Sequence, residues 1–213
     1  MYENNSTDGT KAAIKAFYEN RNANGQYWCE DIPGSRQFGN GIDLKRGIHM
    51  ANLRNTLKDY HGELTSDYVL LLDCDVVFLP DTIARFVATI EDNDNKGVVC
   101  VSPYGIAWGS YRGAKRLHYY DSFALISEDG ISYKETGNKC LFKRCKSCSD
   151  ASKVPAKKRL DDNKLINVRA AFGSITLLKT EVYNQVRWGH SICEHHSFCE
   201  RVRKHGKVVV NPM

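Results

Sequence analysis

DYVLLLDCDVVFLP, residues 67–80, is the stretch of this sequence that decides the predicted fold. Its apolar run, Tyr68 to Leu72, is short and unbroken, which is typical of a buried, central strand. The run stops at two carboxylates one residue apart, Asp73 and Asp75. At this spacing both side chains leave one face of an extended chain, or converge in the turn that ends it. The pair predicts a site for a hard divalent cation. The alternative is that two strand-end aspartates cap the next helix or face water.

Helical and strand-like patterns alternate around this stretch. Helices are expected at Lys11–Ala23, Asp43–Asp59, Asp81–Glu91, Thr180–Val186 and Glu194–His205. Further strands are expected at Val98–Val101, Asp121–Ile126, Val168–Leu178 (with a bend at Gly173 and Ser174) and Val208–Val210, and loops at Asn24–Gly41 and Tyr104–Tyr120. This alternation favours an α/β fold, a Rossmann-like and mostly parallel central sheet flanked by helices. Ligands of such sheets bind at the carboxyl ends of the strands, where the two aspartates lie.

Length, charge and composition describe an ordinary globular chain. The 213 residues predict one domain, and the net charge of +5 does not by itself require nucleic acid as a partner. No apolar stretch approaches the roughly 18 residues that a membrane span needs, and no secretion signal opens the sequence. We therefore expect a soluble, cytoplasmic protein whose eight cysteines are reduced.

Residues 139–160 differ from the rest of the chain. They are polar and strongly basic, with a single acidic residue, Asp150, and they show no periodicity, so we expect a mobile loop. This loop is either solvated or acts as a lid that clamps a diphosphate. Cys140, Cys145 and Cys148 would bind zinc only with a fourth ligand, and otherwise are loop thiols. Nucleic-acid binding is disfavoured because the segment lacks a series of aromatic residues interleaved with its charges.

The order of several segments resembles that of a known family. NNSTDGT (residues 4–10), LRN (53–55), LLLDCDVVFLP (70–80), YDSFAL (120–125), a glycine-containing strand and a late acidic helix start resemble GT-A fold glycosyltransferases. Within them the order is similar to fungal capsule α-1,3-mannosyltransferase-like enzymes and to the N-terminal domain of a chlorella-virus glycosyltransferase for the major capsid protein. The resemblance implies one GT-A domain over residues 1–213. It also implies transfer from a UDP-sugar to a glycan or glycoprotein acceptor, in viral capsid glycan synthesis in the host cytoplasm.

The resemblance also implies where the donor binds. Asp75 would bind the metal, Mn²⁺ or Mg²⁺, and Asp73 would lie nearer the ribose and a metal-bound water. Glu3 and Asn4 would hold uracil or ribose, and Arg54 would lie near the phosphates. The alternative for Arg54 is a plain position on a helix surface. Family members usually have a strand before the NNSTDGT-like segment; here it is supplied otherwise, or the numbering starts late.

Two further carboxylates are candidates for the transfer step. By resemblance, Asp121 would lie near the donor or acceptor sugar, and Glu194 would contact the acceptor or act in catalysis. Glu194 has a second explanation, because Ser191 three residues earlier completes the S-x-x-E pattern of a helix capping box. The resemblance favours retention of anomeric configuration. With inversion, a base must instead reach the acceptor hydroxyl.

A third protein ligand to the metal is expected among the late histidines. His190, His195 and His196 are candidates, and an imidazole ligand would favour Mn²⁺ over Mg²⁺. The alternative for each histidine is a solvated or packed side chain.

Two other classes of protein stay open from the sequence. A sugar-nucleotide nucleotidyltransferase would need a glycine-rich basic loop near its start, and the first ten residues hold only Gly9. A zinc-stabilised binding module would use the cysteines and histidines. We expect a monomer or one part of a longer multidomain chain.

Overall fold

The structure is a computed structural model of the 213-residue chain. It describes residues 1–20, 25–33, 38, 43–74, 76–111, 114–119, 121, 123–130 and 164–212. Asp75 and the basic segment 139–160, with Cys140, Cys145 and Cys148, lie outside the described residues.

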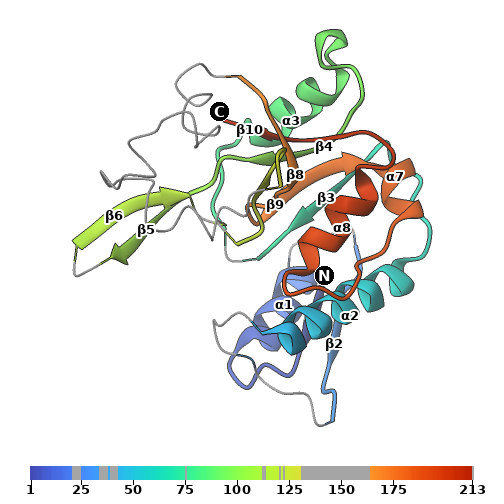
Figure 1. Ribbon diagram of the computed structural model, residues 1–213. Coiled ribbons are helices and arrows are strands. Elements are labelled where there is room, and N and C mark those ends of the chain that lie inside the picture. The colour runs from blue at the N-terminus through green and yellow to red at the C-terminus, as the bar shows by residue number, and fades with distance from the viewer. Residues whose placement is uncertain are drawn as a thin grey trace.

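A six-stranded sheet forms the centre of the molecule (Figure 1). Its strands in spatial order are β3 (Tyr68–Leu72), β9 (Ile175–Lys179), β4 (Val98–Pro103), β10 (Lys207–Asn211), β8 (Ile166–Ala170) and β7 (Ile126–Ser127). β3 therefore ends this sheet, and Leu72 at its end is 43% exposed. The expectation of a central strand was wrong because a short apolar run does not reveal how many neighbours a strand has.

The α/β class is confirmed, but the mostly parallel pairing is wrong. In the part of this sheet that the structure describes, only β4 and β10 pair in parallel, and the other four pairs are antiparallel. β3 and β4 point the same way, as expected for strands joined by a helix, but β9 lies antiparallel between them. A buried strand has the same apolar pattern in either direction, so its sequence could not show this insertion.

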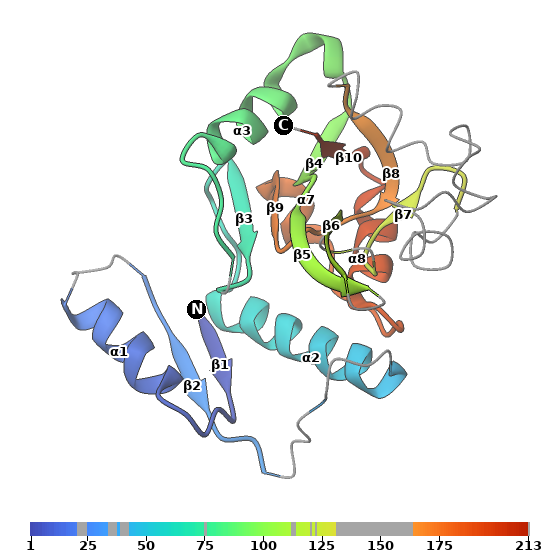
Figure 2. The same cartoon turned by 90° about the vertical axis from the view of Figure 1, so that its left-hand side faces the viewer.

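Helices cover both faces of the sheet. α3 (Thr82–Glu91) packs through Phe86 and Ile90 on Val101, Leu177 and Val209. The neighbouring residues on the same strands point to the opposite face, where α2 (Leu44–His61), α7 (Thr180–Gln185) and α8 (Glu194–Val202) contribute to the second core cluster. The result is a three-layer α/β/α arrangement, visible in Figure 2.

Polar contacts hold much of α2 in place. Leu44, its first residue, is 51% exposed. Instead, the Asn55 side chain donates to the Trp188 carbonyl (2.9 Å) and accepts from the Trp188 N–H (3.0 Å). The buried Lys58 ammonium donates to the carbonyls of Tyr183, Asn184 and Val186 at the end of α7. The helix is thereby fixed to the segment that leads into α8.

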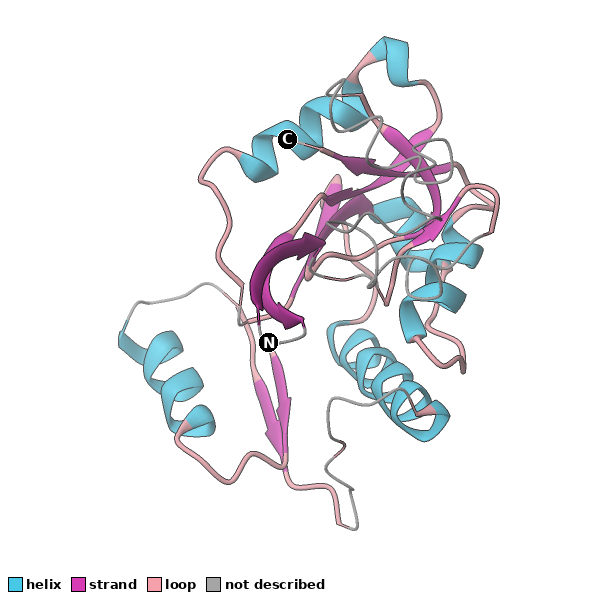
Figure 3. Ribbon diagram, turned by 60° about the vertical axis from the view of Figure 1, so that its left-hand side comes forward, coloured by secondary structure: helices cyan, strands magenta, loops and turns pink. Residues whose placement is uncertain are grey.

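The N-terminal elements form a separate small sheet. β1 (Tyr2–Asn4) pairs in parallel with β2 (Trp28–Glu30), and α1 (Thr10–Asn20) connects them. Figure 3 shows these elements to one side of the main sheet. A short strand thus stands directly at NNSTDGT, and β2 lies inside a region that the sequence analysis expected to be a loop.

Two more segments differ from expectation. The predicted loop Tyr104–Tyr120 contains the antiparallel strands β5 (Ile106–Tyr111) and β6 (Ala114–Tyr119). The predicted strand Asp121–Ile126 is mostly a turn, in which the Ala124 N–H donates to the Asp121 carbonyl (3.2 Å). After α3, a short 3-10 helix η1 (Asn93–Asn95) leads to β4. No helix in the described ranges is long and apolar enough to cross a membrane.

Candidate active site

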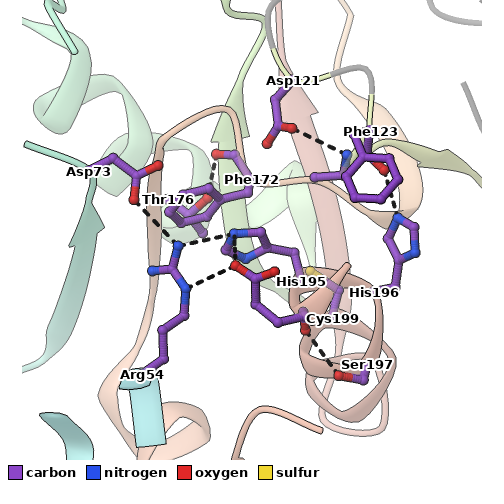
Figure 4. Close-up of polar contacts among 12 residues, drawn as sticks. Arg54, Asp73, Asp121, Phe123, Phe172, Thr176, His195, His196, Ser197 and Cys199 are labelled. Carbon is purple, nitrogen blue, oxygen red and sulfur yellow. Dashed lines mark hydrogen bonds and ion pairs between the residues drawn. The ribbon is translucent and has the colours of Figure 1, made fainter. Parts of the chain in front are cut away.

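Arg54 joins two acidic side chains from distant parts of the chain (Figure 4). It extends from α2, and its Nε lies 3.2 Å from Glu194 Oε1 at the start of α8. Its Nη2 lies 3.4 Å from Asp73 Oδ1, directly after β3, and 3.3 Å from His195 Nε2. We call Arg54, Asp73, Glu194 and His195 the Arg54 cluster. It stands at the carboxyl end of β3, where an α/β sheet binds its ligands.

Glu194 occupies the first position of α8 and does not form the predicted capping box. The N-cap is Cys193, and no side chain caps this helix. The Glu194 carboxylate instead pairs with Arg54 and lies 3.3 Å from His195 Nε2, with the Glu194 side chain only 6% exposed. The capping interpretation was wrong because the helix begins at Glu194 rather than after Ser191. The positive end of the helix dipole adds to the attraction for this carboxylate.

Asp121 is held beside the Arg54 cluster by backbone donors. Its Oδ1 accepts from the Ala124 N–H (3.3 Å), and its Oδ2 accepts from the Gly173 N–H (3.1 Å). Burial raises the pKa of the Asp121 carboxyl, and the negative charges of Asp73 and Glu194 also raise it. The two N–H groups lower this pKa, but the net shift is upward. Asp121 is thus a fixed carboxyl group with an increased tendency to hold a proton.

The three candidate histidines have different surroundings. His195 is buried, and burial followed by the charge of Arg54 lowers its pKa well below the usual value, so its imidazole is neutral. His196 Nε2 lies 2.8 Å from the Phe123 carbonyl, to which it can only donate. His190 is exposed, and its Nε2 lies 3.3 Å from Asn52 Oδ1. The structure therefore brings His195, but neither of the other two, into the Arg54 cluster.

Phe172 is a site residue that the sequence analysis missed. Its ring stacks on the His195 ring at 3.9 Å between centroids, with 13° between the planes. The guanidinium carbon of Arg54 lies 5.0 Å from the centre of the same ring. The only signal in the sequence was the adjacent Gly173 and Ser174, where a bend was expected. Both have positive φ, 62° each, which confirms the bend.

Glu3 and Asn4, the predicted base or ribose contacts, lie on the small sheet in β1. Glu3 Oε1 accepts from the Ser6 N–H (2.7 Å), while Glu3 Oε2 is buried without a partner among the described residues. Asn4 Nδ2 donates to Asn5 Oδ1 (3.1 Å). An unpaired buried carboxylate oxygen is costly, so a donor from outside the described chain would stabilise it.

The described residues offer hard oxygen ligands but no complete metal cage. No group of three or more histidine, cysteine, aspartate or glutamate side chains among them could hold a metal ion. Asp73 alone represents the predicted aspartate pair, because Asp75 lies outside the described residues. Its carboxylate fits a cation that is shared with phosphate oxygens and water.

The acidic side chains and the arginine lie at the carboxyl end of a strand, the place where proteins with an α/β sheet bind their ligands. Residues 2–186 match the sequence model of glycosyl transferase family 2, and the chain belongs to this family. The expected GT-A fold and glycosyltransferase class are thereby confirmed, and the nucleotidyltransferase and binding-module alternatives are set aside. Arg54, Asp73 and Asp121 lie within the matched range, and Glu194 lies beyond it.

The protein is an enzyme that transfers a sugar from a donor to an acceptor. Enzymes of this fold commonly use a divalent metal and a nucleotide sugar. No curated protein matches the chain.

Proposed function

We propose that this enzyme is a metal-dependent glycosyltransferase that takes its sugar from a UDP-sugar and extends a glycan. The observation that carries the proposal is the placement of Arg54 between Asp73 and Glu194 at the carboxyl end of β3. A departing diphosphate gains negative charge, and a fixed cation at the phosphates lowers the energy of that state.

Arg54 is the proposed phosphate contact. Its guanidinium has five N–H donors in a rigid plane, and its ion pairs to Glu194 and Asp73 use only two of its nitrogens, Nε and Nη2. Glu194 holds the guanidinium through Nε, and Nη2 is oriented toward Asp73. A diphosphate beside Asp73 would thus meet an arginine that is already held in place.

The nucleoside is proposed to lie against Glu3 and Asn4. The unpartnered Glu3 Oε2 is an acceptor for the uracil N3–H or a ribose hydroxyl. The Asn4 amide carries both donors and an acceptor for the same groups. Occupation by a nucleoside would remove the cost of the buried, unpaired oxygen of Glu3.

Asp75 and Asp73 are proposed to hold Mn²⁺ or Mg²⁺ together with the diphosphate. When bound, such an ion acts as a Lewis acid toward the leaving phosphate. His195 and His190 were predicted as further ligands. His195 is the better placed, because it lies in the Arg54 cluster and is neutral, whereas His190 lies against Asn52.

Asp121 and Glu194 are proposed as the carboxylates of the transfer step. Glu194 is enclosed by Arg54 and His195, so it positions the arginine and contributes negative charge near the sugar. The pKa of Asp121 is raised, which is the direction expected of a carboxyl group that exchanges a proton during the reaction. Retention, which the resemblance favours, would make Asp121 a stabiliser of the positively charged sugar. Inversion would make it the base for the acceptor hydroxyl. The anomeric configuration of the first-formed product, read by proton NMR, decides between these roles.

The acceptor and biological setting are proposed from the resemblance alone. We propose a glycan on a glycoprotein, with a viral capsid protein as the expected case, modified in the host cytoplasm. We further propose that the protein is a monomer or one part of a longer multidomain chain.

A thermal-shift screen tests the donor assignment. UDP, GDP, CDP and CMP are compared with and without Mn²⁺. A nucleotide at 100 times its dissociation constant stabilises the folded state by about 2.7 kcal/mol, which such a screen detects. We expect UDP to stabilise the protein most, and only with Mn²⁺. Stabilisation by GDP alone would overturn the UDP assignment.

A further inference from the structure

One short segment contacts Asp73, Asp121, Arg54 and His195 of the candidate site. It is the connection between β8 and β9, residues 171–174. The Ser174 carbonyl accepts from the Asp73 N–H (2.9 Å), and the Gly173 N–H donates to Asp121 Oδ2 (3.1 Å). Between them in space, the Phe172 ring lies against Arg54 and His195 (Figure 4). The donor side and the Asp121 side of the site are therefore linked through adjacent residues.

The backbone of this connection is tightly constrained. Gly173 has a φ of 62°, and a Cβ on it would lie 3.1 Å from the Pro103 side chain. Ser174 also has a φ of 62° and is 3% exposed, a conformation that residues other than glycine rarely adopt. The Phe172 carbonyl accepts from Thr176 Oγ1 (2.8 Å). These constraints fix where the Phe172 ring can point.

The Phe172 ring restricts how Arg54 and His195 can turn. A guanidinium near an aromatic face gains cation–π attraction, and a parallel imidazole gains stacking. His195 is in turn 3.3 Å from both Arg54 Nη2 and Glu194 Oε1, so tilting its ring would disturb both contacts. Phe172 thus provides an apolar surface that contacts both Arg54 and His195.

We propose that Phe172 is a positioning residue, which holds the Arg54 guanidinium in the orientation that receives the donor diphosphate. The inference rests on the proposed function for the diphosphate. It goes beyond that function by assigning part of the donor affinity to an apolar side chain that need not touch the donor.

A purely structural role is the competing explanation, because Phe172 is 3% exposed and packs with Ala124 and Cys193. The test therefore compares two identical substitutions. Phe172→Leu removes the ring at the site. Phe86→Leu removes a ring of α3 that is 1% exposed and lies in the core cluster between α3 and the sheet. Phe172→Tyr keeps the ring. All variants are assayed at a temperature where each is folded.

Two readouts separate positioning from packing. We expect Phe172→Leu to weaken Mn²⁺–UDP binding by about tenfold, Phe172→Tyr to restore most of it, and Phe86→Leu to change it less than about twofold. The second readout is the NMR shift of the His195 ring protons, assigned by their loss in His195→Gln. Stacking on Phe172 moves these signals upfield, and only Phe172→Leu should abolish that shift.

The outcomes distinguish a failure of the inference from a failure of the proposed function. Equal losses of affinity in Phe172→Leu and Phe86→Leu, or an unchanged His195 shift in Phe172→Leu, would overturn the positioning role. If the wild-type protein binds no UDP, the proposed function fails, and with it the diphosphate part of the inference. The His195 shift still reports in that case whether Phe172 orders the cluster.

Discussion

Replacing Arg54 by glutamine is the perturbation whose effect follows most directly from the site geometry. The substitution removes a positive charge that lies 3.2 Å from Glu194 Oε1 and 3.4 Å from Asp73 Oδ1. Glu194 would keep its carboxylate in a position that is 6% exposed, without a cation beside it. Arg54→Gln should therefore destabilise the folded protein as well as weaken donor binding.

The magnitude depends on how well water can replace the lost partner. Breaking a buried ion pair costs about 3–5 kcal/mol. Asp73 is 34% exposed, so solvent screens the ion pair between Asp73 and Arg54. The expected loss for Arg54→Gln is therefore the lower end of that range, about 3 kcal/mol. For a domain of this size that loss lowers Tm by roughly 6–12 °C. Glu194→Gln in the Arg54→Gln background should recover part of the loss, because it removes the uncompensated charge.

Arg187→Gln is the matched control. The Arg187 guanidinium binds both Asp59 oxygens at 2.7 and 2.8 Å, a better geometry than that of Arg54, but both side chains are about half exposed. Urea denaturation of the two variants should show a clearly larger loss for Arg54→Gln. If Arg187→Gln cost as much or more, burial would not govern these pairs and the reasoning would be refuted.

Three further predictions concern single positions. Lys58→Met should lower the free energy of unfolding by about 2–4 kcal/mol, because three carbonyls at the end of α7 lose their donor. The control, Lys45→Met, lies on the exposed side of the same helix and should leave the free energy of unfolding nearly unchanged in urea denaturation. Equal losses in the two variants would contradict the structural role of Lys58. Gly47→Ala should destabilise the folded protein by more than about 2 kcal/mol, because the new Cβ would lie 1.9 Å from the Ser191 carbonyl oxygen, although helix propensity alone favours alanine. The control is Gly9→Ala, whose new Cβ would have no atom within 4 Å. A stabilised Gly47→Ala variant would show that the close approach of Gly47 to Ser191 is wrong. Because the pKa of Asp121 is raised, kcat/KM should fall with decreasing pH through an apparent pKa above 3.8, and the residual activity of Asp121→Asn should not show this fall. The same shift makes the stability of the folded protein decrease as pH rises through that window. A fall in kcat/KM at or below pH 3.8 would argue against a role for Asp121.

The sequence located the strand end and the acidic pair but not the environment of β3. An apolar run followed by carboxylates is a local pattern, and β3 ends at Leu72 as that pattern requires. Strand direction and neighbours are set by long-range pairing instead. β9 enters between β3 and β4 from a part of the chain more than 70 residues beyond β4. No local pattern encodes that placement.

For the site residues, too, the sequence predicted the positions but not all of the contacts between them. The order of motifs nominated Arg54, Asp73, Asp121 and Glu194, and the structure brings these four residues together. The capping box suggested by Ser191 and Glu194 does not form because the helix begins at Glu194 itself, and the Glu194 carboxylate pairs with Arg54 instead. Phe172 has no sequence signal of its own, since a buried phenylalanine looks the same whether it packs on leucine or on an arginine.

Calorimetric titration of UDP in the presence and absence of Mn²⁺ tests the central claim most directly, on the wild-type protein and on Asp75→Ala. Asp81→Ala, which removes an exposed aspartate paired with Arg85 just beyond the motif, is the control. The account predicts Mn²⁺-dependent UDP binding to the wild type and to Asp81→Ala, and its loss in Asp75→Ala. Full Mn²⁺-dependent UDP binding by Asp75→Ala would contradict the account.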